Sequence, residues 1–311
     1  MSFEFKRNET VAQGMRRIAM EQVDLILAEV KGRKRISRDR KVHEARKRLK
    51  RLRALLRLTR DSANPKPRRK ADTGLGDAGR ALSGARDAKV RIEAFDLLLK
   101  NLKSHCPAET FQPIRAKLLA QHRQSLQSHS ENSSDKVARL LQAVRHRLKT
   151  IPIHGDDFSG LRSGLKRTYR QGREAFTVAR YDRNAVALHE WRRRVKDLRH
   201  HAELLKPLWP AVLERFEGKA HELANCLGED HDLFVLRQFL LTEAASLSIP
   251  TDLETLLESI DDRRRELQKQ AMQLGERVYA EKPRDFLERM ENYWNAWKAG
   301  QAHDPPLMEA D

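Results

Sequence analysis

Two segments of this 311-residue chain repeat one arrangement of charged side chains. Residues 42–53 and 188–199 both read apolar-His-Glu-x-Arg-basic-basic-apolar-Lys-x-Leu-Arg, at an offset of 146 residues. Guanidinium groups bind phosphate oxygens through paired hydrogen bonds, and lysine adds a compact positive charge. Because these residue types recur together at close spacing, they favour the binding of a phosphate-rich polyanion.

Each segment divides into an apolar and a basic face when its residues are placed on a helix at about 100° per residue. The expected apolar faces are Ala45, Leu49, Leu52 and Leu56, and Trp191, Val195, Leu198, Ala202 and Leu205. The expected basic faces are His43, Arg46, Lys47, Lys50, Arg53 and Arg57, and His189, Arg192, Arg193, Lys196 and Arg199. Like charges along one helix face are unfavourable by a few tenths of a kcal/mol per pair. Their repetition therefore indicates a long anionic ligand more than an ordinary solvated surface.

The histidines of the repeat admit two interpretations, whereas its acids have one simple interpretation. His43 and His189 are expected to donate to phosphate and to be charged when it is bound, although a lone helical histidine is more often a surface or capping group. Glu44 and Glu190 are expected to pair with the arginines four residues later, Arg48 and Arg194.

Weaker repeats flank the two segments in the same order. Arg16-Arg17 precedes the first as Lys166-Arg167 precedes the second, and Arg86-Asp87 follows the first as His231-Asp232 follows the second. Asp87 and Asp232 are either helix caps or acids that orient a basic side chain. Three repeats in one order predict a duplicated unit of about 150 residues.

Apolar residues recur at helical spacing along nearly the whole chain, which predicts an all-α protein. Helices are expected near residues 8–30, 39–62, 71–104, 108–128, 135–149, 157–178, 184–206, 209–229, 231–246, 251–279 and 284–299. The duplication predicts two antiparallel bundles, about 5–150 and 151–300, related by a pseudo-twofold axis within one domain of residues 1–300. Residues 301–311 are expected to form a flexible tail.

The composition narrows the classes of partner. The formal charge is +18 and the pI is about 10.1, so nucleic acid, polyphosphate and anionic membrane are the candidate polyanions. We expect a cytoplasmic protein, because the first residues contain no apolar signal region and no stretch is long and apolar enough to span a bilayer. Cys106 and Cys226 suggest neither a disulfide nor a zinc site, and no metal or cofactor is expected.

The two motif helices, His43–Arg53 and His189–Arg199, and their flanking pairs resemble the CHAD family of helical domains with conserved histidines. The resemblance covers about residues 5–300 and implies two bundles around a basic central groove that holds inorganic polyphosphate, often at polyphosphate granules. Carried over residue by residue, it implies ligands at Arg16, Arg17, His43, Arg46, Lys47, Lys50, Arg53, Lys166, Arg167, His189, Arg192, Arg193, Lys196 and Arg199.

Two departures from the family pattern affect this expectation. Members often follow a triphosphatase-like CYTH domain with an ExExK signature, whereas only Phe3-Glu4-Phe5-Lys6 is similar here, so a stand-alone module is expected. The first half has Arg86 where the second has His231, so the halves need not contact a ligand in the same way.

Three other functions compete with non-catalytic polyphosphate binding. A metal-dependent phosphohydrolase or polyphosphatase would use His221-Glu222 and residues 229–232, but the basic faces bring almost no carboxylate to hold metal at a phosphate. Nonspecific nucleic-acid binding fits the charge, yet no aromatic residue lies on the basic faces to stack on bases. Membrane-surface binding lacks a helix with a bulky apolar face free of core contacts.

Overall fold

The computed structural model describes residues 3–30, 38–82, 84–101, 111–128, 131–247 and 252–300. Its helices are α1 (Val11–Val30), α2 (Arg38–Leu58), α3 (Pro65–Ala81), α4 (Gly84–Asn101), α5 (Gln112–Ser128), α6 (Glu131–Thr150), α7 (Ser159–Asp182), α8 (Ala185–Leu205), the 3-10 turn η2 (Lys206–Leu208), α9 (Pro210–Leu247), α10 (Asp252–Val278) and α11 (Pro283–Ala299). The prediction of an all-α fold is confirmed. The expected tail, residues 301–311, lies outside the described residues.

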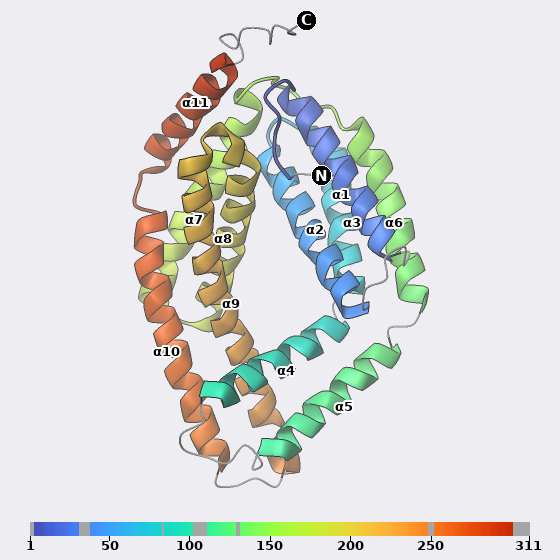
Figure 1. The fold of residues 1–311 in the computed structure, drawn as a ribbon, viewed down its shortest axis with the longest axis vertical. Helices are drawn as coiled ribbons and strands as arrows, with labels where there is room; N and C mark the ends of the chain where they lie inside the picture. Colours follow the sequence, from blue (N-terminus) through green and yellow to red (C-terminus); the bar gives the residue numbers. More distant parts are fainter. Residues whose placement is uncertain are drawn as a thin grey trace, which may run out of the picture.

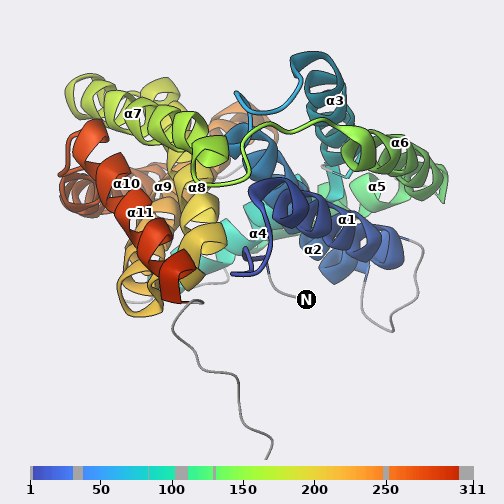
Figure 2. The ribbon, with the colours of Figure 1, turned by 90° about the horizontal axis from the view of Figure 1, so that it is seen from above.

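The helices form two groups that stand side by side (Figure 1). Helices α1, α2, α3 and α6 pack together in one group, and α7, α8, α9, α10 and α11 pack together in the other. Helices α2 and α8 are the inner helices and contact each other between the outer ones (Figure 2). Helices α4 and α5 leave the first group and pack together below it, where α4 contacts α9 of the second.

Two hydrophobic cores hold these groups together. The larger core takes side chains from both groups, among them Met15, Leu52 and Trp191. The smaller core lies where α4 and α5 meet α9 and α10, and it includes Phe95 and Leu236. Because both cores draw on both halves of the sequence, the halves depend on each other for burial of apolar surface. Within the described part of the chain, no helix is long and apolar enough to cross a membrane.

The expected break around residues 64–67 is instead the start of a helix. Pro65 and Pro67 lie in the first turn of α3, where a missing backbone N–H removes no intrahelical bond. The Asn64 side chain caps this turn by accepting from the Lys66 backbone N at 3.3 Å. The single helix expected over 71–104 was also wrong, because α3 ends at Ala81 and α4 begins at Gly84.

Helix α9 runs without interruption where two helices were expected, over 209–229 and 231–246. Leu223, Leu227 and Leu236 keep one buried face through the expected break. Gly228 alone does not end a helix whose neighbours are buried on both sides of it. Helices α2 and α8 begin at residues 38 and 185, and α3 and α9 at 65 and 210, each near the offset of the sequence repeat. The pseudo-twofold relation of the halves stays a prediction.

The apolar faces expected for the two motif helices are confirmed. Buried side chains, none more than 4% exposed, are Ala45, Leu49, Leu52 and Leu56 on α2, and Trp191, Val195, Leu198, Ala202 and Leu205 on α8. The amphipathic pattern therefore predicted which side of each helix packs into the core. The basic face lies on the opposite side of each helix.

Helix α7 crosses the end of α2 at a glycine. A Cβ atom at Gly164 would lie 1.8 Å from the Leu58 backbone O and 2.9 Å from the Arg57 backbone O. Only glycine allows the two backbones to approach this closely, so Gly164 sets how α7 lies on α2.

We expect Gly164→Ala to lower the free energy of unfolding by about 1–3 kcal/mol or more, because the added methyl group overlaps backbone that cannot move aside. Gly218→Ala in α9 is the matched control: its Cβ would meet no atom within 4 Å, so it should leave stability unchanged or raise it by up to about 1 kcal/mol. Thermal or urea unfolding of the two variants measures both effects. Equal stability of the two would contradict the close approach.

Candidate functional site

Cations of α2 and α8 meet at the contact between these two inner helices. Lys196 of α8 is largely buried, and its pKa is held well below the usual lysine value by burial first and then by the charges of Arg192, Lys50 and Arg199. Asp232 of α9 is the one carboxylate among these influences that opposes the effect. Basic side chains from both halves of the chain are therefore close enough to repel one another.

Three histidines lie among these cations. Burial first, and then the charges of Arg192, His189 and Lys196, lower the pKa of His231 on α9 to about 4. The His189 and His231 rings are 4.7 Å apart between centroids. The pKa of His221 is also lowered, by burial first and then by Arg199, with Lys47 adding to the effect.

We name this assembly the central basic cluster. It consists of Lys47 and Lys50 on α2, His189, Arg192, Lys196 and Arg199 on α8, and His221 and His231 on α9. The pKa of His189 is lowered as well, by burial first and then by its cationic neighbours. An anion placed here would relieve the repulsion and favour the protonated form of each histidine.

The Arg192 side chain lies next to Gly228 and Asp232, both on α9. A Cβ at Gly228 of α9 would lie 3.6 Å from Arg192 Nη2, and Arg192 Nη2 lies 3.9 Å from Asp232 Oδ1. In the first half, Arg46 Nη2 lies 3.5 Å from Asp87 Oδ1 in the same relation. The cap interpretation of Asp232 was wrong, because that residue lies inside α9. Both acids are placed to orient an arginine of a basic face.

The far end of the α2 basic face is engaged by acids. Arg53 Nε donates to Asp72 Oδ1 at 2.8 Å, and Arg57 Nη1 donates to Asp197 Oδ1 of α8 at 2.7 Å. Burial raises the pKa of Asp197, against the effect of Arg57. These two predicted ligands therefore join helices in the free protein, and the central basic cluster begins one turn earlier, at Lys50.

The paired basic residues of α1 and α7 lie outside the central basic cluster. Arg17 is bound by Glu9 at 2.6 Å, Arg16 Nη2 donates to the Ile151 backbone O at 3.4 Å, and Arg167 Nη2 donates to Asp61 at 2.9 Å. The hydrogen-bonding groups of these side chains are satisfied by tertiary contacts, which the sequence repeat could not show.

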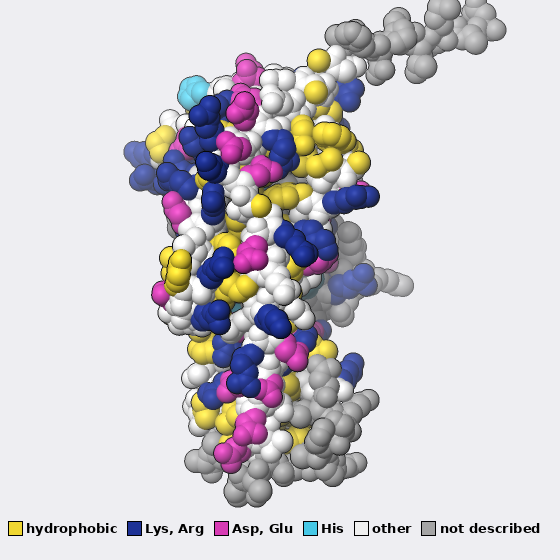
Figure 3. Space-filling view, turned by 90° about the vertical axis from the view of Figure 1, so that its left-hand side faces the viewer, with side chains coloured by type: hydrophobic (Ala, Val, Ile, Leu, Met, Phe, Trp, Pro, Cys, Tyr) yellow, Lys and Arg dark blue, Asp and Glu magenta, His cyan; other side chains and the backbone are white. Residues whose placement is uncertain are grey.

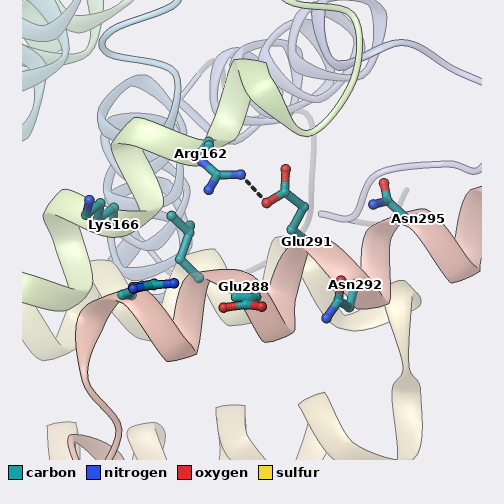
Figure 4. A pocket seen from close by; sticks show the side chains of 8 residues that line it. Arg162, Lys166, Glu288, Glu291, Asn292 and Asn295 are labelled. Carbon is teal, nitrogen blue, oxygen red and sulfur yellow. Dashed lines mark hydrogen bonds and ion pairs between the residues drawn. The ribbon is translucent and has the colours of Figure 1, made fainter.

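Lys166 lines a surface pocket of about 400 Å³ between α7 and α11. Arg162 and Lys166 point toward it from α7, and Arg162 forms an ion pair with Glu291 of α11 (Figure 4). The pocket carries acidic and amide groups as well as cations. On the outer face of α7, α10 and α11, basic and acidic side chains are likewise interspersed (Figure 3).

The remaining predicted residues have mixed outcomes. Glu190 pairs with Arg194 at 2.6 Å as predicted, and it also accepts from Arg193 at 2.7 Å. The pairing of Glu44 with Arg48 was wrong, because Arg48 Nε binds Glu29 of α1 at 3.0 Å instead. His43 is exposed on α2. The side chain of Arg86 lies outside the described residues.

His221 and His231 were not predicted as members of the cluster, because two separate helices were expected over the residues that form α9. On one continuous helix, His221, Asn225, Gly228 and Asp232 follow at spacings of three or four and share a face. Asn225 Nδ2 lies 3.5 Å from His221 Nε2 on this face. Recognition of α9 as a single helix would have identified the third wall of the site.

The acidic run of α9 is occupied by arginines of α10. Glu229 accepts from Arg263 Nε at 2.8 Å, and the buried Asp230 accepts from Arg264 Nε at 3.1 Å and from Gln268 Nε2 at 2.8 Å. Among the described residues, no group of three or more His, Cys, Asp or Glu side chains is placed to hold a metal ion.

Comparison with known proteins agrees with the all-α fold and with the family resemblance. A family model described as the CHAD domain matches residues 17–241, which is more than half of the chain. Among solved structures, the chain is similar to the crystal structure of the CHAD domain from the plant Ricinus communis, with a TM-score of 0.54, 18% identity and 95% of each chain covered. No curated protein matches. The two basic histidine-containing helices and the helical fold around them thus identify this chain as a member of the CHAD domain family.

Proposed function

We propose that this protein binds inorganic polyphosphate without consuming it, through the central basic cluster. The observation that carries the proposal is the approach of Lys50 and Lys196 from opposite halves of the chain, with Arg192 and Arg199 beside them. Repulsion among these cations, of which Lys196 is largely desolvated, costs free energy in the absence of a ligand, and a bound polyanion removes that cost.

The composition of the cluster suits a phosphate chain better than a nucleic acid. Its members are lysine, arginine and histidine, which donate to phosphate oxygens. The basic faces of α2 and α8 carry no Phe, Tyr or Trp on which a base could stack. CHAD domains are in general polyphosphate-associated, which supports the same ligand class. We further propose a cytoplasmic location with association to polyphosphate granules.

Long-chain polyphosphate should raise the unfolding temperature of the protein at about 200 mM salt, whereas DNA at equal phosphate concentration should not. A ligand at about a thousand times its Kd stabilises the folded state by about 4 kcal/mol, so the shift should be clear. Lys50→Glu and Lys196→Glu should each reduce it, because each places a negative charge among the cations that face the ligand. Thermal unfolding with each polyanion measures these shifts.

The control for these variants is Lys269→Glu, on an exposed position of α10 away from the cluster. It changes the net charge equally and should leave the polyphosphate shift intact. An equal shift with DNA, or an equal loss in all three variants, would indicate general charge attraction rather than a site.

Polyphosphate affinity should rise as the pH falls from about 8 to about 6. The pKa values of His189 and His231 are lowered in the free protein, so both are neutral near pH 7 and must take up protons to pair with phosphate. Calorimetric titration in buffers of different ionisation enthalpy measures the proton uptake. His189→Gln with His231→Gln should flatten the pH dependence, whereas His154→Gln, at an exposed position between α6 and α7, should not. Affinity that stays constant over this range would refute the assignment.

Incubation with polyphosphate and Mg²⁺ or Mn²⁺ should release no phosphate above a protein-free control. Glu229 and Asp230 are held by arginines of α10, which leaves few carboxylates to hold a metal at a bound phosphate. A colorimetric phosphate assay tests this. Release that depends on metal and is lost in Asp232→Asn would support the phosphohydrolase alternative.

A further inference from the structure

A second group of cations lies where α2 ends and α3 begins. Residues 60–70 contain five basic side chains, Arg60, Lys66, Arg68, Arg69 and Lys70. Their only acid, Asp61, is bound by Arg167 of α7 at 2.9 Å. Among the described residues, none of the five cations forms a salt bridge, in contrast to Arg53 and Arg57 one or two turns earlier.

Arg68 is buried in this group without a partner for its Nε. The residue is 7% exposed, and its Nε makes no hydrogen bond. Burial lowers the pKa of its guanidinium, and the charges of Arg60 and Arg69 lower it further, while Asp72 and Asp61 oppose them. A buried guanidinium without a hydrogen-bonded carboxylate is costly, and an anion bound nearby would offset its charge.

The position on α3 strengthens the attraction for an anion. The first turn of a helix carries a partial positive charge, and acids are usually found there, but the first turn of α3 contains none. Pro65 and Pro67 have no N–H, and the Lys66 N–H is taken by Asn64 Oδ1. An anion at this turn would therefore be held by side chains and not by backbone amides.

The group continues the basic face of α2. Arg60 follows Arg57 by three residues, and its backbone N donates to the Arg57 O at 3.3 Å. Arg53 is bound to Asp72, one turn beyond Arg68 on α3. From Lys50 to Arg60 the rise of 1.5 Å per residue gives a separation of about 15 Å. A linear polyanion that leaves the central basic cluster along α2 would reach Arg60 and Arg68.

We propose that Arg60, Lys66, Arg68, Arg69 and Lys70 form a second phosphate-binding site. The site recognises a phosphate group through unpaired cations, and this part stands on its own. The effect of the second site on affinity rests on the proposed function of the central basic cluster. A polyphosphate chain long enough to span both sites binds more tightly than a short one. The protein thus selects long chains by the distance between two sites.

Lysine footprinting tests the second site directly. The full-length protein is acetylated briefly at about 200 mM salt without ligand, with tripolyphosphate and with long-chain polyphosphate, and each lysine is followed by mass spectrometry. We expect long chains to slow acetylation of Lys66 and Lys70 as well as Lys50. Tripolyphosphate should protect Lys50 more than Lys66 and Lys70. Lys269, exposed on α10, should react at one rate throughout.

Each pattern of protection has one meaning. Protection of Lys50 with unchanged Lys66 and Lys70 would overturn the second site and leave the proposed function standing. Protection of Lys66 and Lys70 alone would establish the second site and remove the central one. Protection of none of the three by long chains would overturn both.

A charge-reversed pair gives the matching affinity measurement. Arg60→Glu with Arg69→Glu, both at exposed positions, should weaken long-chain binding about tenfold or more at fixed salt and leave tripolyphosphate binding unchanged. Arg215→Glu with Lys269→Glu changes the net charge equally at exposed positions of α9 and α10. Equal weakening by the two pairs would overturn the proposal.

Discussion

The structure depends on holding two basic helices together against their own repulsion. Unit charges about 6–10 Å apart repel by about 2–3 kcal/mol at an effective dielectric constant of 20, more than an exposed ion pair contributes. Helices α2 and α8 are instead joined by partly buried contacts. Arg51 forms an ion pair with Glu203, Arg57 pairs with Asp197, and His201 Nε2 donates to the Ala54 backbone O at 2.8 Å. On α2 all three contacts use residues that follow Lys50, and they brace the helices that carry the central basic cluster.

This arrangement explains why the pKa values of basic side chains differ along the α2–α8 pair of helices. Where acids cross between the helices, arginines stay charged and serve as links. Toward Lys50 and Lys196 cations outnumber the nearby acids Asp232 and Glu217, which pair with Arg192 and Arg199. The pKa values of Lys196, His189, His221 and His231 are all lowered there. The charged forms of these four side chains are therefore disfavoured in the free protein. Anion binding and proton uptake are then coupled, since each phosphate favours the charged forms.

Much of the fold and part of the site followed from local pattern. Helical spacing located the apolar faces of α2 and α8, because each face repeats with the period of the helix. Two boundaries failed. Pro65 and Pro67 were treated as a break, although proline fits a first turn. A helix end was expected near residue 230, although the buried face of α9 continues through it. Because two helices were expected in place of α9, the shared face that carries His221 and Asp232 was not recognised as part of the site.

The sequence alone determined that this is an all-α chain with two repeated basic helices and a large excess of positive charge, because helix period and charge are local properties. It also identified the family through the same residues. Only the tertiary structure decided which cations face one another and which are neutralised. Arg17, Arg53 and Arg167 share the residue type of Arg192, yet each meets an acid outside the central basic cluster, whereas Arg192 lies among other cations and 3.9 Å from Asp232. The partner of a charged side chain is set by helices distant in sequence, which no spacing along the chain can show.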